Sequence, residues 1–174
     1  MSINFNIEES KKINGLVSIK PSINYDSRGN IWTSFLKKEI ECLLPEGSYF
    51  NHDKFSESKK NVLRGIHGDN KSWKLVTCVF GDIDQVIVDC RANSPTYYQW
   101  EKYNINSKNR VLLLIPPGMG NAYHVKSEIA LYHYKLAYSG IYYDADQQFS
   151  LKWNDPKINI DWSVKDPILS DRDR

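Results

Sequence analysis

The residues with the clearest chemical potential lie in one stretch, Asn61 to Thr77 (NVLRGIHGDNKSWKLVT). Its apolar residues predict two strands joined by a polar turn. The strands carry Arg64, His67 and Lys74, and cations are costly to bury unless they face a cavity or an anionic ligand. The stretch therefore predicts a ligand site, although its spacing alone also fits a solvated strand face with one incidental histidine.

Two kinds of side chain near this stretch could move protons. An imidazole such as that of His67 can hold or release a proton near neutral pH, and we expect Lys74 and Arg64 to favour its neutral form and to stabilise an oxyanion. Tyr132 and Tyr134 stand two apart in ALYHYKLAY, so both should point to one face of a strand, where a buried phenol can act as an acid. A structural histidine and aromatic core packing remain open as alternatives.

A metal site and a phosphate loop are not predicted. Metal-binding barrels usually place two histidines one residue apart and add a carboxylate and a third histidine later. Here Asp69 occupies the slot after His67-Gly68, and GMGN at 118–121 supplies no histidine. No Walker or GxGxxG pattern occurs. Of the other charged groups, Asp89 and Arg91 are predicted to form a structural ion pair.

The composition is that of an ordinary globular protein. Its 174 residues suit one sizeable core, so we predict a single domain over 1–174. A net charge of +2 gives no large basic field, and nucleic acid is not an expected partner. There is no apolar run of about 18 residues and no signal-peptide pattern, so no membrane partner is expected. Cys42, Cys78 and Cys90 show no CxxC spacing and are predicted to be reduced, in a cytoplasmic protein.

Short strand-like runs separated by turn formers dominate the chain from residue 48 onward. The predicted strands cover residues 49–55, 62–67, 74–80, 83–90, 100–105, 111–115, 122–125, 130–137 and 149–153. Before them we predict an edge strand within 3–20, a loop over 21–29, a strand over 30–36 and a short helix over 37–44, and after them an irregular tail. Many short strands predict a sandwich or barrel, because each half-buried sheet needs a partner layer.

Several motifs, taken in order, resemble those of one enzyme family. They are VLRGIH, KLV, VDCR followed by SPT and Trp100, IPPG, WNDP, IDW and ILSDRD, and they resemble the nucleotide-sugar 3,5-epimerases of the dTDP-4-dehydrorhamnose type. The resemblance runs from about Tyr25 to Asp173. It implies an all-β cupin, a jelly-roll barrel (double-stranded β-helix) with one or two short helices, which is usually a homodimer and uses no cofactor.

The resemblance also implies a reaction and its residues. A base removes a proton beside the C4 ketone of a nucleotide-linked 4-keto-6-deoxy sugar, an enolate forms, and an acid returns a proton to the opposite face of C3 or C5. The base falls on His67, the acid on Tyr134 and the carboxylate that orients the base on Asp173. Lys74 is predicted to stabilise the enolate oxygen. The residues predicted to contact substrate or line the pocket are Arg28, Arg64, Asn121, His52, Lys54 and Tyr132.

Some positions depart from the family pattern. Asn121 stands where the family typically has histidine, and His52 and Lys54 stand where enzymes for the thymidine nucleotide usually have Gln and Asn. The combination RGIHGD, HDKF, GMGNA and DADQQF resembles epimerases that act on GDP-4-keto-6-deoxy-heptoses in bacterial capsule synthesis. We therefore predict a GDP-linked heptose as substrate. A dTDP-4-keto-6-deoxy-glucose 3,5-epimerase and a cupin 3,4-ketoisomerase are the alternatives, and inversion of C3 alone or of both carbons is left open.

Overall fold

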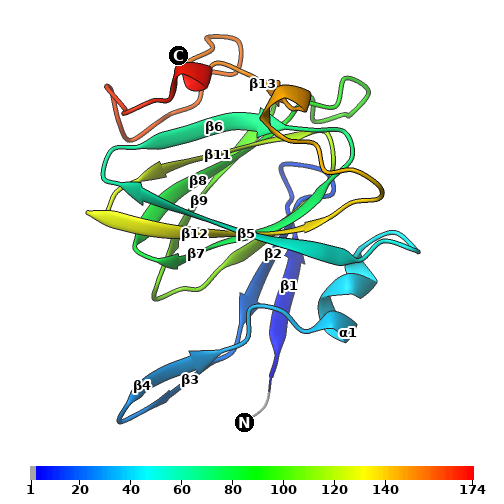
Figure 1. Ribbon diagram of the computed structural model, residues 1–174, viewed down its shortest axis with the longest axis vertical. Coiled ribbons are helices and arrows are strands. Elements are labelled where there is room, and N and C mark those ends of the chain that lie inside the picture. Colours follow the sequence, from blue (N-terminus) through cyan, green and yellow to red (C-terminus); the bar gives the residue numbers. More distant parts are fainter. Residues whose placement is uncertain (1–2) are drawn as a thin grey trace.

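Two antiparallel sheets form the body of the protein in the computed structural model, which describes residues 3–174 (Figure 1). The first sheet contains, in spatial order, β1 (Phe5–Glu9), β2 (Val17–Pro21), β10 (Leu112–Ile115), β7 (Trp73–Phe80), β12 (Ile129–Ala137) and β5 (Phe50–Lys59). The second contains β13 (Phe149–Ser150), β6 (Leu63–Gly68), β11 (Met119–Val125), β8 (Asp82–Asp89) and β9 (Trp100–Asn106). The predicted all-β architecture is confirmed.

The main core lies between the two sheets. Side chains alternate across a strand, so every second residue of β7, β8, β10, β11 and β12 points inward. Val76, Ile87, Leu113 and Tyr123 belong to this core and are at most 1% exposed. Burial of each such side chain contributes about 1.5–3 kcal/mol to folding. The two sheets therefore form a rigid frame for the side chains that face the open end of the barrel.

The N-terminal region differs from its prediction. Instead of one edge strand within 3–20, β1 and β2 form a hairpin, and the predicted loop over 21–29 contains β3 (Ile23–Asp26). β3 pairs with β4 (Gly29–Trp32) in a separate ribbon, which projects at the end of the molecule opposite the C-terminal tail (Figure 1). Asp26 pairs directly with Gly29. The turn and β4, which overlaps the strand predicted over 30–36, were therefore recognised from the sequence, whereas β3 was not.

The only α-helix in residues 3–174 is shorter than predicted. α1 (Lys37–Ile40) leads into a 3₁₀ turn, η1 (Glu41–Leu43), rather than running to residue 44. Ile40 and Leu44 pack with Leu75 and Leu112 on the outer face of the first sheet. This contact, more than the four-residue helix itself, fixes the segment in place.

The strand predicted over 149–153 ends at Ser150, and the tail that follows is irregular, as predicted, and anchored along β6. The Leu63 N–H donates to the Ile168 carbonyl at 3.1 Å, and the Ile168 N–H donates to the Asn61 carbonyl at 2.8 Å. The tail ends in a 3₁₀ turn, η3 (Asp171–Asp173), which contacts β6. This anchor brings the last residues of the chain to the strand that carries His67.

Cys42, Cys78 and Cys90 are all free thiols, as predicted. Within the described part of the chain, no helix has the length and apolar character that a membrane crossing requires.

Candidate active site

A cavity of about 280 Å³ opens between the two sheets. Its walls come from both sheets, from the loop after β12 and from the tail. The lining residues are Lys54, Ser56, Arg64, His67, Lys74, Asn121, Tyr134, Leu136, Tyr142, Asp144, Ala145, Gln148, Ser170, Arg172 and Asp173. The cavity thus contains all four side chains that the resemblance assigned to catalysis.

His67 is held by a carboxylate from the tail. Its Nε2 lies 2.5 Å from Asp173 Oδ1, and Ser170 Oγ donates to Asp173 Oδ2 at 2.8 Å. Burial raises the pKa of Asp173, but the hydrogen bonds from His67 and Ser170 lower it by more than burial raises it. The net pKa is below the ordinary value, so the carboxylate stays ionised. An ionised carboxylate accepts a hydrogen bond from Nε2–H. The free lone pair is then on Nδ1, which is the basic nitrogen of the imidazole.

Tyr134 enters the cavity from the facing sheet. It lies on β12, whereas His67 lies on β6, so the two side chains approach the cavity from opposite walls. Burial raises the pKa of Tyr134 well above its ordinary value, which keeps the phenol protonated. His133 and Lys135 point to the other face, where they contact Asp53 at 2.6 and 2.7 Å. The predicted alternation along this strand is confirmed.

Lys74 is a buried cation with one acidic neighbour. Its side chain is 9% exposed, and its Nζ lies 3.2 Å from Asp69 Oδ2. The two groups form an ion pair, but their geometry is not that of a hydrogen bond. Burial lowers the pKa of Lys74, while Asp69 opposes that shift. Asp69 Oδ1 accepts the backbone N–H groups of Lys71 and Ser72 at 2.9 and 2.6 Å. The turn after β6 thus positions the carboxylate that accompanies Lys74.

Further cations line the cavity mouth. Arg64 Nε donates to Ser58 Oγ at 2.9 Å, and Lys54 Nζ lies 5.6 Å from the ring centre of Tyr142. His52 is not in the cavity wall, but its ring packs edge-on against Tyr142 at 4.9 Å. The predicted contacts at His52 and Lys54 are therefore grouped around one aromatic ring at the mouth.

Besides His52, two more predicted site residues are not part of the cavity wall. The prediction that Tyr132 lines the pocket is corrected, because its side chain is 0% exposed and lies behind the wall, with its hydroxyl 3.5 Å from Asn121 Oδ1. Arg28 is at the tip of the β3–β4 ribbon, where its side chain is 84% exposed and pairs with Asp26 at 2.5 Å. A single chain does not bring Arg28 to the cavity.

Comparison with known proteins identifies the family. The family model described as dTDP-4-dehydrorhamnose 3,5-epimerase matches residues 10–174. The chain belongs to this family. It is 37% identical to the dTDP-4-dehydrorhamnose 3,5-epimerase of Salmonella typhimurium, over 89% of this chain and 85% of that one. It is therefore a nucleotide-sugar epimerase of the isomerase class.

Solved structures of the family show the same cupin barrel. The dTDP-6-deoxy-D-glucose-3,5-epimerase of Legionella pneumophila, in complex with dTDP-4-keto-L-rhamnose, superposes with a TM-score of 0.89 at 35% identity, over 98% of this chain and 90% of that one. A 3′-monoepimerase from Streptomyces bikiniensis, in complex with dTDP-quinovose, gives a TM-score of 0.83 at 29% identity, over 92% and 82% of the two chains. The predicted cupin fold is confirmed.

Some residues of the epimerase cavity were not predicted from the sequence. Asp69 was interpreted only as a residue of the polar turn that fills the slot of a metal-binding histidine, and not as the partner of Lys74. Arg172 lines the cavity beside Asp173, and Tyr142 and Gln148 come from the loop after β12. No periodic pattern marks such loop residues. Arg172 and Gln148 do lie within the motifs ILSDRD and DADQQF, whereas the only signal for Tyr142 is the high aromatic and polar content of residues 138–148.

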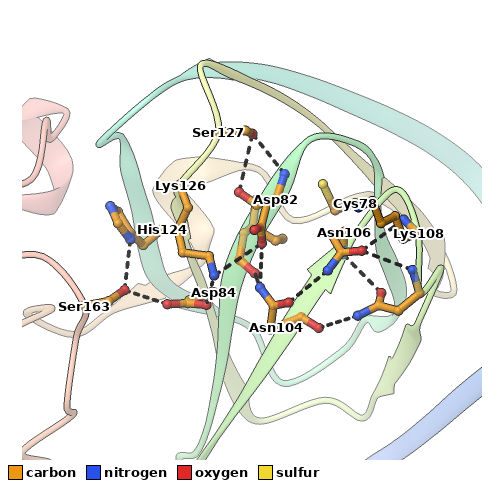
Figure 2. Close-up of polar contacts among 12 residues, drawn as sticks. Cys78, Asp82, Asp84, Asn104, Asn106, Lys108, His124, Lys126, Ser127 and Ser163 are labelled. Carbon is orange, nitrogen blue, oxygen red and sulfur yellow. Dashed lines mark hydrogen bonds and ion pairs between the residues drawn. The ribbon is translucent and has the colours of Figure 1, made fainter.

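A second group of His, Asp and Ser side chains lies outside the cavity wall (Figure 2). Ser163 Oγ donates to Asp84 Oδ2 at 2.5 Å and lies 3.4 Å from His124 Nδ1, while Lys126 Nζ lies 3.2 Å from Asp84 Oδ1. His124 is 4% exposed. Neither this group nor any other among residues 3–174 gathers three His, Cys, Asp or Glu side chains in a metal-binding arrangement.

The ion pair predicted between Asp89 and Arg91 is confirmed. Arg91 contacts the fully buried Asp89 carboxylate at 2.8 Å, and Ser94 and Thr96 donate to the same carboxylate at 2.5 and 2.6 Å. Neither Asp89 nor Arg91 is part of the cavity wall. The pair therefore holds the end of β8 in place and takes no part in the site.

Proposed function

We propose that the protein inverts C3 and C5 of a nucleotide-linked 4-keto-6-deoxy sugar through an enolate. The observation that carries the proposal is the placement of His67 and Tyr134 on facing sheets around one cavity, with Asp173 holding the imidazole. Inversion of a carbon requires removal of its proton from one side and delivery of a proton from the other. A base and an acid on opposite walls meet that requirement.

The steps follow from the geometry. His67 Nδ1 removes the proton from the carbon beside the C4 ketone, and Asp173 stabilises the imidazolium that results. The electron pair of the broken C–H bond forms a double bond to C4 and displaces the carbonyl π pair onto the C4 oxygen. When the ketone re-forms, the electron pair returns to the same carbon, which takes the proton of the Tyr134 hydroxyl on its opposite face and leaves a tyrosinate. Solvent then returns a proton to the tyrosine and takes one from the histidine. A proton from water therefore replaces the original proton at each inverted carbon.

Lys74 supplies the charge that the enolate needs. Its ammonium group is buried next to Asp69, so a second anion in the cavity would contact a cation that water screens little. Two unit charges 4 Å apart interact by about 4 kcal/mol at an effective dielectric constant near 20. A contribution of that size acts on the enolate more than on the neutral ketone, and it therefore lowers the barrier rather than merely binding substrate.

The nucleotide distinguishes two candidate substrates. The Salmonella relative and the Legionella structure are both named for dTDP sugars, which favours dTDP-4-keto-6-deoxy-glucose. The GDP-linked heptose is the second candidate, because the motifs HDKF and GMGNA, which contain His52, Lys54 and Asn121, resemble those of GDP-heptose epimerases. His52 and Lys54 both lie beside the Tyr142 ring. The Streptomyces bikiniensis relative is a 3′-monoepimerase, so inversion of C3 alone is compatible with this fold.

The position of Arg28 favours a homodimer. Arg28 does not reach the cavity of its own chain. It can contact the substrate, as predicted, only if the β3–β4 ribbon reaches the cavity of a second copy. Mixing Arg28→Ala with His67→Asn tests this arrangement. In mixed dimers, the site with an intact His67 would receive the intact Arg28 of the partner, so activity should recover to roughly a quarter of the wild-type value. No recovery, despite demonstrated subunit exchange, would show that Arg28 does not act across a dimer.

Deuterium incorporation from D₂O tests the reaction and the substrate together. We expect the wild type to incorporate deuterium at C3 and C5 of dTDP-4-keto-6-deoxy-glucose, and His67→Asn to incorporate none. His133→Asn, on the outer face of β12, is the matched control and should behave as the wild type. Incorporation only into a GDP-linked heptose would favour the second candidate. A ketone that moves from C4 to C3, seen by carbon NMR, would show a ketoisomerase instead.

The cytoplasm is the compartment that we propose for this reaction. All three cysteines are free thiols, which suits a reducing environment. No metal or other cofactor has a step in the proposed mechanism.

A further inference from the structure

A fully buried glutamine contacts the cavity residue Asn121 from behind. Gln85, on β8, is 0% exposed, and its Nε2 donates to the Ala122 carbonyl at 2.7 Å and to Asn121 Oδ1 at 2.6 Å. Gln85 lies opposite Tyr123 in the β8–β11 pairing. Because side chains two apart share a face, Tyr123, Asn121 and Gln85 all point into the barrel.

The backbone determines which end of the glutamine amide faces which neighbour. A carbonyl oxygen such as that of Ala122 can only accept a hydrogen bond, so the atom 2.7 Å from it must be the NH₂ nitrogen of Gln85. The second proton of the same NH₂ group then points at Asn121, which must present its oxygen. Turning the Gln85 amide over would place its oxygen against the carbonyl oxygen of Ala122 and the oxygen of Asn121.

This arrangement also determines the orientation of Asn121. Its Oδ1 accepts from Gln85 and is 3.5 Å from the hydroxyl of Tyr132, which lies on the facing sheet. Its Nδ2 has no hydrogen-bond partner among residues 3–174, and Asn121 is part of the cavity wall. The atom available to a ligand is therefore an N–H donor and not an acceptor.

We infer that Gln85 is a positioning residue, which fixes the Asn121 amide so that its N–H group donates to the C4 oxygen of the substrate. The inference rests on the proposed function and extends it to a residue that never touches the sugar. Lys74 and Asn121 would then form a two-donor site for the enolate oxygen, with one charged and one neutral member. An oxygen at the position of Nδ2 would instead repel the enolate.

Side-chain NMR tests the orientation without any need for turnover. In the ¹⁵N-labelled wild type, the Gln85 NH₂ protons should exchange slowly with water, and the Asn121 NH₂ group should exchange faster. In Gln85→Glu, studied at a pH high enough to ionise the new carboxyl group, the carboxylate can only accept, so the Asn121 amide should turn, and its NH₂ protons should become protected. If Asn121 keeps its exchange rates in a folded Gln85→Glu variant, or if Gln85 is unprotected in the wild type, the inference is wrong.

Kinetics test the consequence. Gln85→Glu should lower kcat about 10²-fold, as loss of one oxyanion donor does, with KM changed by less than about threefold. The double variant Gln85→Glu, Asn121→His should have a kcat about tenfold above that of Gln85→Glu alone. The carboxylate can accept one imidazole N–H and leave the other facing the cavity. Gln85→Met serves if the buried Glu prevents folding, and its kcat should also fall at least tenfold.

Thr77→Val is the matched control for these variants. Thr77 is likewise 0% exposed and donates to a backbone carbonyl, that of Val111, at 2.8 Å, but it is not in the cavity wall. Its stability should fall while kcat stays within about twofold of the wild type. Equal losses of kcat in Thr77→Val and Gln85→Met would show that Gln85 is only structural. If the wild type does not turn over any nucleotide sugar, the proposed function fails, and the NMR result still decides the orientation of Asn121.

Discussion

The protein contains two groups of the same three residue types, and only one of them is arranged for catalysis. In the cavity, Asp173 binds His67 Nε2 and Ser170 supports the carboxylate. In the other group, Ser163 lies between Asp84 and His124, and Lys126 pairs with Asp84 (Figure 2). The His67 side chain is 23% exposed and lines the cavity, whereas His124 is 4% exposed.

The difference shows what makes a histidine a base in this fold. His67 lines the cavity and has a carboxylate on Nε2, so a proton taken up at Nδ1 would be stabilised by Asp173. His124 has only a hydroxyl beside Nδ1, and its Nε2 is buried without a partner among the described residues. A proton on His124 would be a buried charge, and burial together with Lys126 outweighs the attraction of Asp84. Residue types alone therefore do not distinguish the two groups, but the free nitrogen and the access to it do.

The largest expected effect comes from exchanging the two histidines for asparagine. His67→Asn should lower kcat about 10³-fold, the usual contribution of a general base, with little change in melting temperature. His124→Asn should leave kcat near the wild-type value and destabilise the fold by about 2 kcal/mol, or roughly 4–8 °C in Tm. Steady-state assays and thermal unfolding of both variants check the pair. A reversed pattern would place the active base at His124.

Removal of the acid should come next in size. Tyr134→Phe should lower the rate of inversion about 10²-fold while deuterium exchange at the same carbon survives better, because the base and Lys74 remain. The separation should be largest at C5. Comparing exchange by mass spectrometry with inversion by NMR measures it. If exchange and inversion fall equally, Tyr134 has a structural role and not that of the acid.

A smaller effect is expected from the two carboxylates. Asp173→Asn should lower kcat by about 10- to 100-fold, since an amide supports the imidazolium less than a carboxylate does. Asp84→Asn, the equivalent change in the other group, should leave kcat unchanged and affect only stability. Parallel assays of kcat and of urea unfolding compare the two. A large loss of kcat in Asp84→Asn would mean that the second group is coupled to the site.

The smallest expected effect is a pH dependence of stability that arises from His124. Burial lowers the pKa of His124, Asp84 opposes this shift, and Lys126 adds to it. The unfolded chain therefore binds a proton at a higher pH than the folded protein does. Stability from this residue is present above about pH 6.5 and is lost as the pH falls below that value. Urea unfolding from pH 7.5 to 5.5 should show the loss in the wild type, and a smaller loss in His124→Gln.

The sequence was sufficient to predict the barrel and most of the cavity. Alternation in ALYHYKLAY placed Tyr134 on the inner face and His133 on the outer face, because strand geometry allows no other arrangement. The motifs led to His67, Lys74 and Asn121, which lie on central strands, and to Asp173 in the tail. All four line the cavity.

Other features depend on contacts that no local pattern encodes. β3 has only four residues, too short for a periodic signal, so this half of the β3–β4 ribbon was predicted as a loop with Arg28 at a site. Tyr132 has the same strand face as Tyr134, yet its ring packs against Tyr123 at 4.3 Å and is sealed from the cavity. The partnership between Gln85 and Asn121 joins neighbouring strands from positions 36 residues apart.

The facing walls that carry the base and the acid also specify what should inhibit the enzyme. During the reaction, the carbon between His67 and Tyr134 passes through a flat, trigonal geometry, with negative charge gathered on one oxygen near Lys74. A rigid planar ring that bears a phenolate-like oxygen and is linked to a diphosphate would match that state better than any chair-shaped sugar. Tight-binding ligands for this barrel should therefore be sought among flat, acidic heterocycles rather than among sugar analogues.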